Sequence, residues 1–143
     1  MNKLTLDALK AAIDEAQRIV LTVHVHPDGD AVGALLGMYE ALVNYGKDVT
    51  MIVDDVIPEK FHFLQYADAV LSAADVKHIE GDMLLVLDAS TYERIGRVGP
   101  LCKGMKLYNI DHHISNSEFA DGLYLRPDFA AVSYTHLRAH ETR

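Results

Sequence analysis

The sequence predicts an α/β fold in which an open, mainly parallel sheet carries helices on both faces. Hydrophobic segments of strand length alternate along the chain with longer segments of helical periodicity, which is the pattern of βαβ crossovers. The segment 83–87, "MLLVL", is apolar throughout, as is typical of strands that are covered on both sides. The 143 residues are enough for one such domain with its own hydrophobic core.

The expected elements follow this alternation in order. A helix is predicted over Thr5–Gln17, where apolar residues recur at helical spacing on one face. A strand is predicted over Ile19–Val25, and a largely apolar helix over Ala31–Tyr45, which Gly46 ends. The remaining expected strands are Asp48–Val53, Ala69–Leu71, Met83–Leu87, Lys106–Ile110 and Leu123–Leu125, with short helical segments over Pro58–Leu64 and Tyr92–Cys102.

The composition favours a soluble cytoplasmic protein. The net charge of −8 argues against a broad electrostatic grip on long duplex nucleic acid. The single cysteine, Cys102, excludes an internal disulfide and suits a reducing compartment. The charged N-terminus does not resemble a signal peptide, and the longest apolar stretch, Ala31–Tyr45, is too short to span a membrane. The sequence leaves the oligomeric state open.

The last twelve residues, "VSYTHLRAHETR" from Val132 to Arg143, fit the rest of the chain poorly. They resemble a translated sequencing-library adapter, so we exclude residues 132–143 from the fold as a non-native tail. The alternative is a genuine basic helix with His136 and His140 four residues apart. Residues 1–131 are then expected to be the N-terminal part of a domain that continues past Ala131 in the natural protein.

Carboxylate and imidazole groups follow three of the expected strands. The first strand runs into "HVHPDGD", "MLLVL" is followed by an aspartate, and "KLYNI" is followed by "DHH". Ligands bind beyond the carboxyl ends of parallel strands, so we expect these groups at one edge of the sheet. So many anionic and imidazole groups in one place would repel one another unless cations neutralise them. The candidate residues are His24, Asp28, Asp30, Asp88, Asp111, His112 and His113.

This mixture of ligand types favours Mn²⁺, with Mg²⁺, Fe²⁺ and Co²⁺ as alternatives, and the absence of thiolates argues against a structural zinc site. Seven groups are too many for one ion and suit two ions that share a bridging carboxylate. Two metals about 3.5–4 Å apart can activate a water for in-line displacement at phosphorus. The alternative is a non-catalytic nucleotide-binding module that holds one structural ion. A glycine-rich loop would favour that reading, and "HPDGDA" has only one glycine.

The three motifs, "HVHPDGDAVG", "LLVLDAS" and "NIDHHISN", resemble in this order those of the DHH family of phosphoesterases. The resemblance covers residues 19 to about 127, and the surrounding residues are similar to the branch of bifunctional oligoribonucleases and 3′-phosphoadenosine-5′-phosphate (pAp) phosphatases. It implies a hydrolase whose substrate is a small nucleotide or short RNA. A cyclic-dinucleotide phosphodiesterase and a manganese-dependent inorganic pyrophosphatase are the alternatives within the family.

The resemblance also implies two metal ions, with Mn²⁺ preferred and Mg²⁺ or Co²⁺ as substitutes. His24, Asp28 and Asp88 are expected to hold one ion. Asp30, Asp88 and His112 are expected to hold the other, so that Asp88 bridges the two.

The remaining roles concern substrate. The resemblance implies that His113 faces the substrate phosphate and that Asp111 orients the neighbouring histidines, so these two form the expected catalytic pair. Arg94 is a further candidate for phosphate binding, whereas His26 occupies a variable position of its motif. A fourth acidic motif and a C-terminal substrate-binding domain of the family are not found before Ala131, so this segment alone is expected to be inactive.

Overall fold

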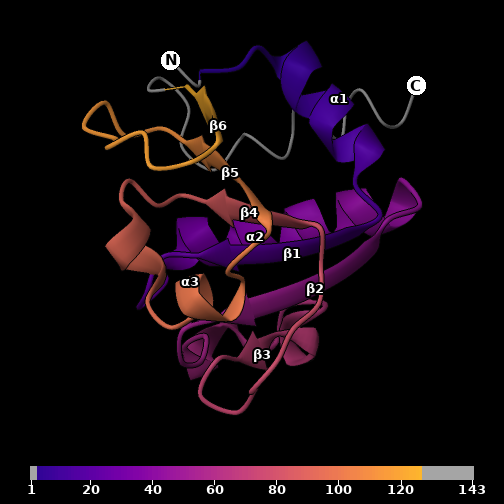
Figure 1. Ribbon diagram of the computed structural model, residues 1–143. Helices are drawn as coiled ribbons and strands as arrows, with labels where there is room; N and C mark the ends of the chain where they lie inside the picture. The colour runs from indigo at the N-terminus through magenta and orange to yellow at the C-terminus, as the bar shows by residue number, and fades with distance from the viewer. Residues whose placement is uncertain (1–2, 127–143) are drawn as a thin grey trace.

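The computed structural model describes residues 3–126, so the expected foreign tail lies outside the described residues. All six strands run parallel in one sheet of order β3-β2-β1-β4-β5-β6 (Figure 1). The strands are β1 Arg18–Val23, β2 Asp48–Val53, β3 Leu71–Ser72, β4 Met83–Leu87, β5 Lys106–Asp111 and β6 Gly122–Leu125. The open parallel sheet that the alternating pattern predicts is therefore confirmed.

The helices are α1 Leu6–Glu15, α2 Gly29–Asn44 and α3 Val98–Leu101, with single 3₁₀ turns η1 Glu59–Phe61, η2 Ala67–Ala69 and η3 Tyr92–Ile95. Two helices begin at a side-chain cap. Thr5 accepts a hydrogen bond from Ala8 N at the start of α1, and Asp28 accepts one from Ala31 N at the start of α2. Within the described part of the chain, no helix is long and apolar enough to cross a bilayer.

Some elements differ from their predicted bounds. The strand β1 ends two residues early, at Val23, because the N–H of Val25 donates to the carbonyl of Arg94 (2.7 Å) and not to a neighbouring strand. The helix expected over residues 58–64 is only the turn η1. Tyr66 then adopts a left-handed conformation (φ 73°), which cannot continue a right-handed helix. The strand expected over residues 69–71 is displaced to the two residues of β3.

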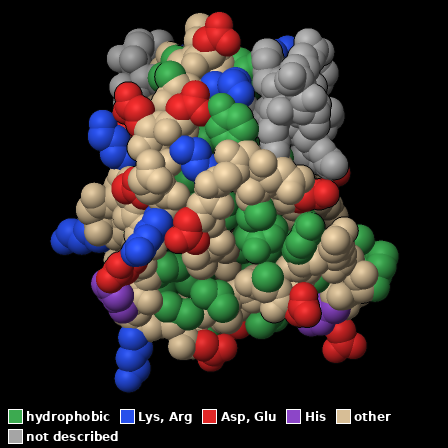
Figure 2. Space-filling view, turned by 90° about the vertical axis from the view of Figure 1, so that its right-hand side faces the viewer, with side chains coloured by type: hydrophobic (Ala, Val, Ile, Leu, Met, Phe, Trp, Pro, Cys, Tyr) green, Lys and Arg blue, Asp and Glu red, His purple; other side chains and the backbone are tan. Residues whose placement is uncertain are grey.

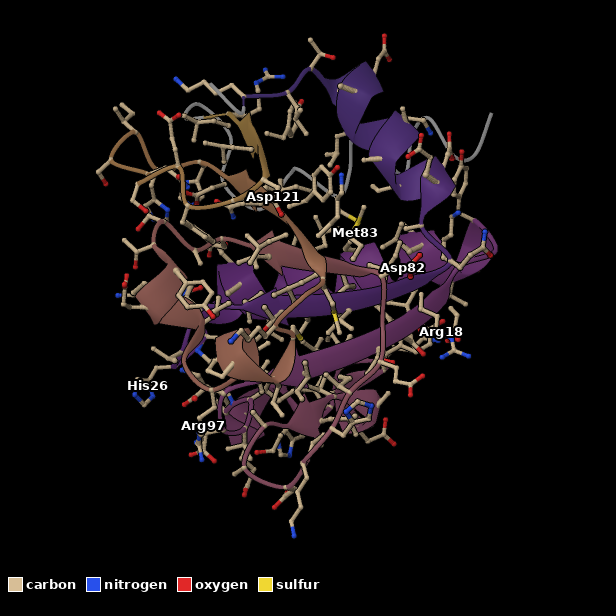
Figure 3. All side chains as sticks on the ribbon, in the orientation of Figure 1. Arg18, His26, Asp82, Met83, Arg97 and Asp121 are labelled. Carbon is tan, nitrogen blue, oxygen red and sulfur yellow. The ribbon has the colours of Figure 1, made fainter. Side chains whose placement is uncertain are left out.

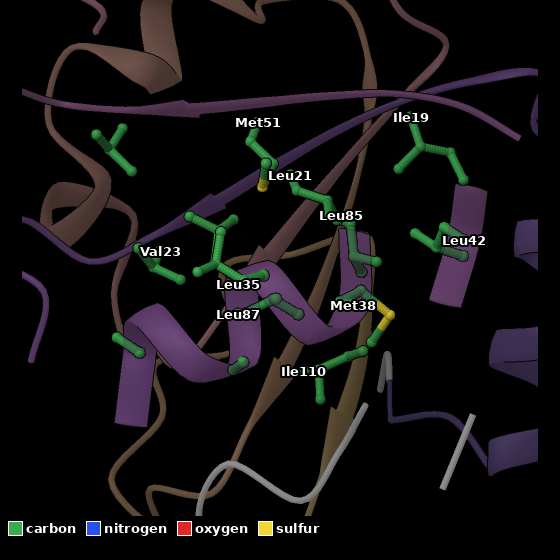
Figure 4. Packing of buried hydrophobic residues seen from close by; sticks show 14 of the residues in the cluster. Ile19, Leu21, Val23, Leu35, Met38, Leu42, Met51, Leu85, Leu87 and Ile110 are labelled. Atoms are coloured by element: carbon green, nitrogen blue, oxygen red, sulfur yellow. The ribbon is translucent and has the colours of Figure 1, made fainter. Parts of the chain in front are cut away.

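Apolar side chains cover both faces of the sheet. Figure 4 shows one face, where Leu35 and Met38 of α2 pack with Leu21 of β1 and Leu85 of β4. Each buried side chain of this kind contributes about 1.5–3 kcal/mol. The opposite face, which α3 and η3 cover, is formed by the residues that alternate with these: Val20, Leu84 and Val86, packed with Ile95, Val98 and Cys102. Burial raises the pKa of the Cys102 thiol to about 11, as expected for a core residue.

Because all strands are parallel, the two ends of the sheet are chemically distinct. Arg18 and Asp82 lie at the amino end, and His26 and Arg97 lie at the carboxyl end (Figure 3). The face at the amino end carries acidic and basic side chains intermixed around apolar patches (Figure 2). The carboxyl end is where the three sequence motifs meet.

Candidate metal centre

The centre of the sheet contains a topological switch point. From β1 the chain moves outward to β2 and β3 on one side, and β4, β5 and β6 lie on the other side. Open α/β sheets bind ligands in the crevice beyond the carboxyl ends of the strands at such a point. His24 directly follows β1 and Asp88 directly follows β4, so the loops of the first two motifs adjoin across the switch point.

The first group of potential ligands consists of His24, Asp28 and Asp88, each of which offers one ligand atom within 4.8 Å of the others. The Nε2 atom of His24 lies 3.6 Å from Asp88 Oδ2 and 4.0 Å from Asp28 Oδ1. The Nδ1 atom of the same ring lies 2.7 Å from the carbonyl oxygen of Val25. Since a carbonyl only accepts, Nδ1 carries a proton, and a neutral ring then presents the Nε2 lone pair to the group. This is the usual arrangement of a metal-binding histidine.

The first turn of α2 separates the two aspartates of the first motif. Asp28 caps the helix through its contact with Ala31 N (3.0 Å) and belongs to the first group. Asp30 is exposed inside the first turn and belongs to neither group of potential ligands, so its metal role stays a prediction. His26, exposed at φ 52°, is also outside both groups.

Asp88 connects the two groups. It adopts the left-handed conformation (φ 58°) immediately after β4, which aspartate tolerates better than most residues. Its N–H donates to the carbonyl of Ile110 on β5 (2.9 Å). Its Oδ1 lies 2.7 Å from Nε2 of His112, and its Oδ2 faces His24. The two oxygens thus point to imidazoles that follow two different strands, which is the geometry a shared carboxylate requires.

Without a cation, the carboxylate of Asp88 lies against two imidazoles, those of His24 and His112. Burial opposes the charged form of Asp88, but hydrogen bonds from His24 and His112 outweigh it and lower the pKa of the carboxyl. The hydrogen bond with Asp88, against a smaller effect of burial, raises the pKa of His24. Both shifts favour a charged Asp88 beside a protonated His24, so a divalent cation bound here would replace the proton on Nε2 of His24.

The second group consists of Asp88, Asp111, His112 and His113. Asp111 has a fully buried side chain, and both of its oxygens are already in use. Oδ1 lies 2.7 Å from Nδ1 of His113, and Oδ2 accepts from Nδ2 of Asn116 (2.7 Å). This carboxylate therefore fits the orienting role implied by the resemblance better than the role of a metal ligand.

Two arginines near the site behave differently. Arg94 is exposed on η3, and its backbone carbonyl accepts from Val25. Arg97 bonds through its backbone N–H and its guanidinium to Asp54 at the end of β2 (2.8 and 3.0 Å). These bonds hold the pKa of Asp54 below its usual range. Arg97 is thus engaged in the fold, and the role of Arg94 stays a prediction.

Sequence reasoning missed Asn109 and Asn116, which hydrogen-bond to each other and lead to Asp111. A signal was present, because Asn109 is a polar residue within the otherwise apolar second half of a predicted buried strand. Buried amides are retained only where they are hydrogen-bonded.

Residues 18–135 match the DHH family, N-terminal domain. The chain belongs to the DHH family. It is 34% identical over 135 residues to the bifunctional oligoribonuclease and PAP phosphatase NrnA of Thermus thermophilus, with 92% of this chain and 38% of that protein covered. It is 30% identical over 115 residues to the protein of the same name from Bacillus subtilis, with 80% of this chain and 35% of that protein covered. The DHH chain thus spans little more than a third of these relatives.

A solved structure has the same fold. An exopolyphosphatase-related protein from Bacteroides fragilis superposes with a TM-score of 0.85 over 94% of this chain and 43% of that chain. The two sequences are 24% identical, so the likeness concerns the fold alone. It agrees with the parallel sheet described above.

The donor set of this DHH domain fits a divalent cation. Carboxylate oxygens and imidazole nitrogens converge at the switch point, and the single thiol, Cys102, is buried in the core on one face of the sheet. Oxygen and nitrogen ligands of this kind suit Mn²⁺ and related ions. These acidic and histidine groups are therefore close enough to hold a metal.

Proposed function

We propose that this DHH domain belongs to a two-metal phosphoesterase that hydrolyses short oligoribonucleotides, pAp or both, with Mn²⁺ as the preferred ion. The observation that supports it best is Asp88, whose two oxygens face His24 and His112 across the switch point of the sheet. Both curated relatives carry names that describe this pair of activities.

The residues of the domain would divide the work. His24, Asp28 and Asp88 would hold one ion, and Asp88 and His112 would hold the other together with Asp30. Bound divalent ions would neutralise charge on the phosphate and lower the pKa of a coordinated water.

His113 would contact the substrate phosphate. Its Nδ1 is engaged by Asp111 (2.7 Å), so Nε2 is the ring nitrogen that would face the phosphate, as an acceptor from a P–OH group or, once protonated, as a donor to a phosphate oxygen. Arg94 on η3 is the candidate for a further contact with the phosphate.

The proposal extends to the protein that contains this chain. Because the relatives are more than twice as long, we propose that residues after Ala131 supply the last metal ligand and a substrate-binding domain. The substrate would be a small nucleotide or short RNA, and the location the cytoplasm.

The test uses the parent protein, with the gene read past Ala131. We expect it to hydrolyse pAp or ribodinucleotides with saturating Mn²⁺, and residues 1–131 alone to show no measurable hydrolysis. Cyclic dinucleotides and pyrophosphate are assayed in parallel, and a preference for either would replace the proposed substrate. No hydrolysis of any of the four would contradict the proposal and favour a non-catalytic module.

A variant sharpens this test. His113→Ala in the parent should lose activity and keep most of its metal affinity, because that imidazole is assigned to phosphate. A rate for residues 1–131 comparable with that of the parent would show that the active site is complete within them.

A further inference from the structure

Behind the metal centre, a series of side-chain hydrogen bonds connects strand β4 to His113. Asn109 of β5 is completely buried, and its Nδ2 donates to the carbonyl of Val86 on β4 (2.9 Å). Asn116, in the loop after the two histidines, donates from Nδ2 to Asn109 Oδ1 (2.8 Å) and to Asp111 Oδ2 (2.7 Å). The other oxygen of Asp111 accepts from Nδ1 of His113 (2.7 Å). The series thus begins on the main chain of the sheet and ends at an imidazole.

The direction of each hydrogen bond in this series is fixed. The carbonyl of Val86 can only accept, so the amide nitrogen of Asn109 faces it and the amide oxygen of Asn109 faces Asn116. Both hydrogens of Asn116 Nδ2 are then used, and Asn116 Oδ1 accepts from the N–H of Glu118 (2.6 Å). If the Asn116 amide were flipped, its oxygen would face two acceptors, Asn109 Oδ1 and Asp111 Oδ2. The Glu118 N–H would also lose its acceptor. The Asn116 amide therefore has one favourable orientation.

We propose that Asn116, held by Asn109, is a positioning residue for His113. The amide of Asn116 donates a hydrogen bond to Oδ2 of Asp111, so the buried carboxylate accepts from His113 through Oδ1 alone. This fixes the ring of His113 in the Nδ1–H tautomer and leaves Nε2 for substrate. The use of Nε2 on phosphate rests on the proposed function, whereas the tautomer follows from the hydrogen bonds themselves.

A rival role for Asn116 is to hold its loop. The Glu118 N–H depends on the Asn116 oxygen, and a second bond from Ser117 N to Ser90 O (2.8 Å) holds the same loop. The variant Asn116→Asp separates the two roles. It keeps an oxygen for Glu118 N but replaces the donor to Asp111 with a carboxylate that repels it.

The kinetic experiment compares Asn116→Ala and Asn116→Asp in the parent protein with Ser115→Ala, a change at an exposed residue of the same loop. Loss of an outer partner of this kind costs about 10- to 100-fold in activity. We expect both Asn116 variants to lower kcat by that factor, with a smaller change in KM and unchanged Mn²⁺ affinity, since no proposed metal ligand is altered. Ser115→Ala should match the unchanged protein. Recovery of the original kcat in Asn116→Asp would overturn the proposal in favour of the loop role.

A second readout does not require activity. In the parent protein labelled with ¹⁵N at histidine and loaded with diamagnetic Mg²⁺, NMR should find His113 as the Nδ1–H tautomer. Both Asn116 variants should give a mixture of tautomers at the same pH, with melting temperatures that confirm folding. If Asn116→Ala does not fold, the nearly isosteric Asn116→Asp decides. An unchanged His113 tautomer in the folded variants would overturn the inference. A changed tautomer in a parent without phosphoesterase activity would instead contradict only the proposed function.

Discussion

Both ends of the sheet carry aspartates, but two of those at the amino end, Asp82 and Asp121, bind main-chain amides. Asp82, just before β4, accepts from the N–H groups of Gln17 and Arg18 (2.8 and 2.7 Å). Asp121, just before β6, accepts from Leu107 N on the neighbouring strand β5 (2.8 Å). Each of these exposed carboxylates therefore caps the start of an adjacent strand, and its partners are permanent parts of the fold.

At the carboxyl end, Asp88 and Asp111 bind imidazoles, whereas Asp54 binds Arg97. The side chains of Asp88 and Asp111 are 12% and 0% exposed, and one oxygen of each lies 2.7 Å from an imidazole, that of His112 and that of His113 respectively. An imidazole can give up its proton and bind a cation, whereas a main-chain amide cannot. The difference shows that an acidic sheet end becomes a candidate metal site through the chemistry of its partners and their burial, and not through the number of carboxylates.

The largest expected effect comes from replacing Asp88, the residue that belongs to both groups of potential ligands at the carboxyl end. Asp88→Asn in the parent should lower phosphoesterase activity by about 10³-fold, since each metal supplies several kcal/mol of transition-state stabilisation. It should also remove most of the rise in melting temperature that Mn²⁺ produces. The matched control is Asp82→Asn at the amino end, which should keep both. An intact Mn²⁺-induced shift in Asp88→Asn would contradict the bridging role.

The next effect is the pH dependence of the carboxyl end. The pKa of His24 is raised by its contact with Asp88. The protonated imidazole therefore stabilises the fold fully below pH 6.5, and this stabilisation is lost as the pH rises through the raised pKa. The pKa of Asp88 is lowered, so the charged carboxylate stabilises the fold fully above pH 3.8. This stabilisation is lost as the pH falls through the lowered pKa. Metal-free protein should therefore melt at a lower temperature at pH 8 than at pH 6. Each unit by which the pKa of His24 is raised corresponds to about 1.4 kcal/mol in the free energy of unfolding.

Saturating Mn²⁺ should reverse this trend, since the ion competes with protons for the same ligands. Thermal melts in EDTA and in Mn²⁺ at the two pH values give the comparison. In metal-free Asp88→Asn, the decrease in melting temperature between pH 6 and pH 8 should largely vanish. A decrease of the original size would show that another group causes it.

A smaller effect is expected at the amino end. Asp82→Asn should lower the free energy of unfolding by about 1 kcal/mol, because the amide keeps one acceptor and loses the charge-assisted bond to a main-chain N–H. The loss should be equal at pH 6 and pH 8, since the lowered pKa of Asp82, due first to the Gln17 N–H, titrates well below both. Urea unfolding at the two pH values measures this loss. A loss that grows with pH would contradict the view that only the carboxyl end is sensitive to pH in this range.

The smallest effect concerns the exposed ion pairs at the amino end. Glu80 contacts Arg18 at 2.9 Å, but both side chains are more than half exposed. Glu80→Gln should change the free energy of unfolding by less than about 0.5 kcal/mol, and this difference should shrink at high salt. A loss above 1 kcal/mol in urea unfolding would mean that surface charge at this end has a structural role.

Most of the sheet was predictable because its signals are local. "MLLVL" is apolar at every position, and the observed strand β4 has the predicted bounds. Where tertiary partners decide, the prediction was less accurate. Val25 continues the strand pattern, but its N–H bonds to Arg94 O and β1 has already ended. The two-residue strand β3 likewise depends only on its pairing with β2.

The sequence by itself determined that carboxylates and imidazoles follow three parallel strands, because alternation along the chain fixes which end of each strand they occupy. The tertiary structure decided which of them meet. It places Asp88 in a left-handed conformation between two histidines and buries Asp111 with a hydrogen bond from Asn116. It also leaves Asp30 exposed in the first turn of α2. Sequence spacing cannot specify these outcomes, since they depend on which hydrogen-bond donor reaches each oxygen once the strands are paired.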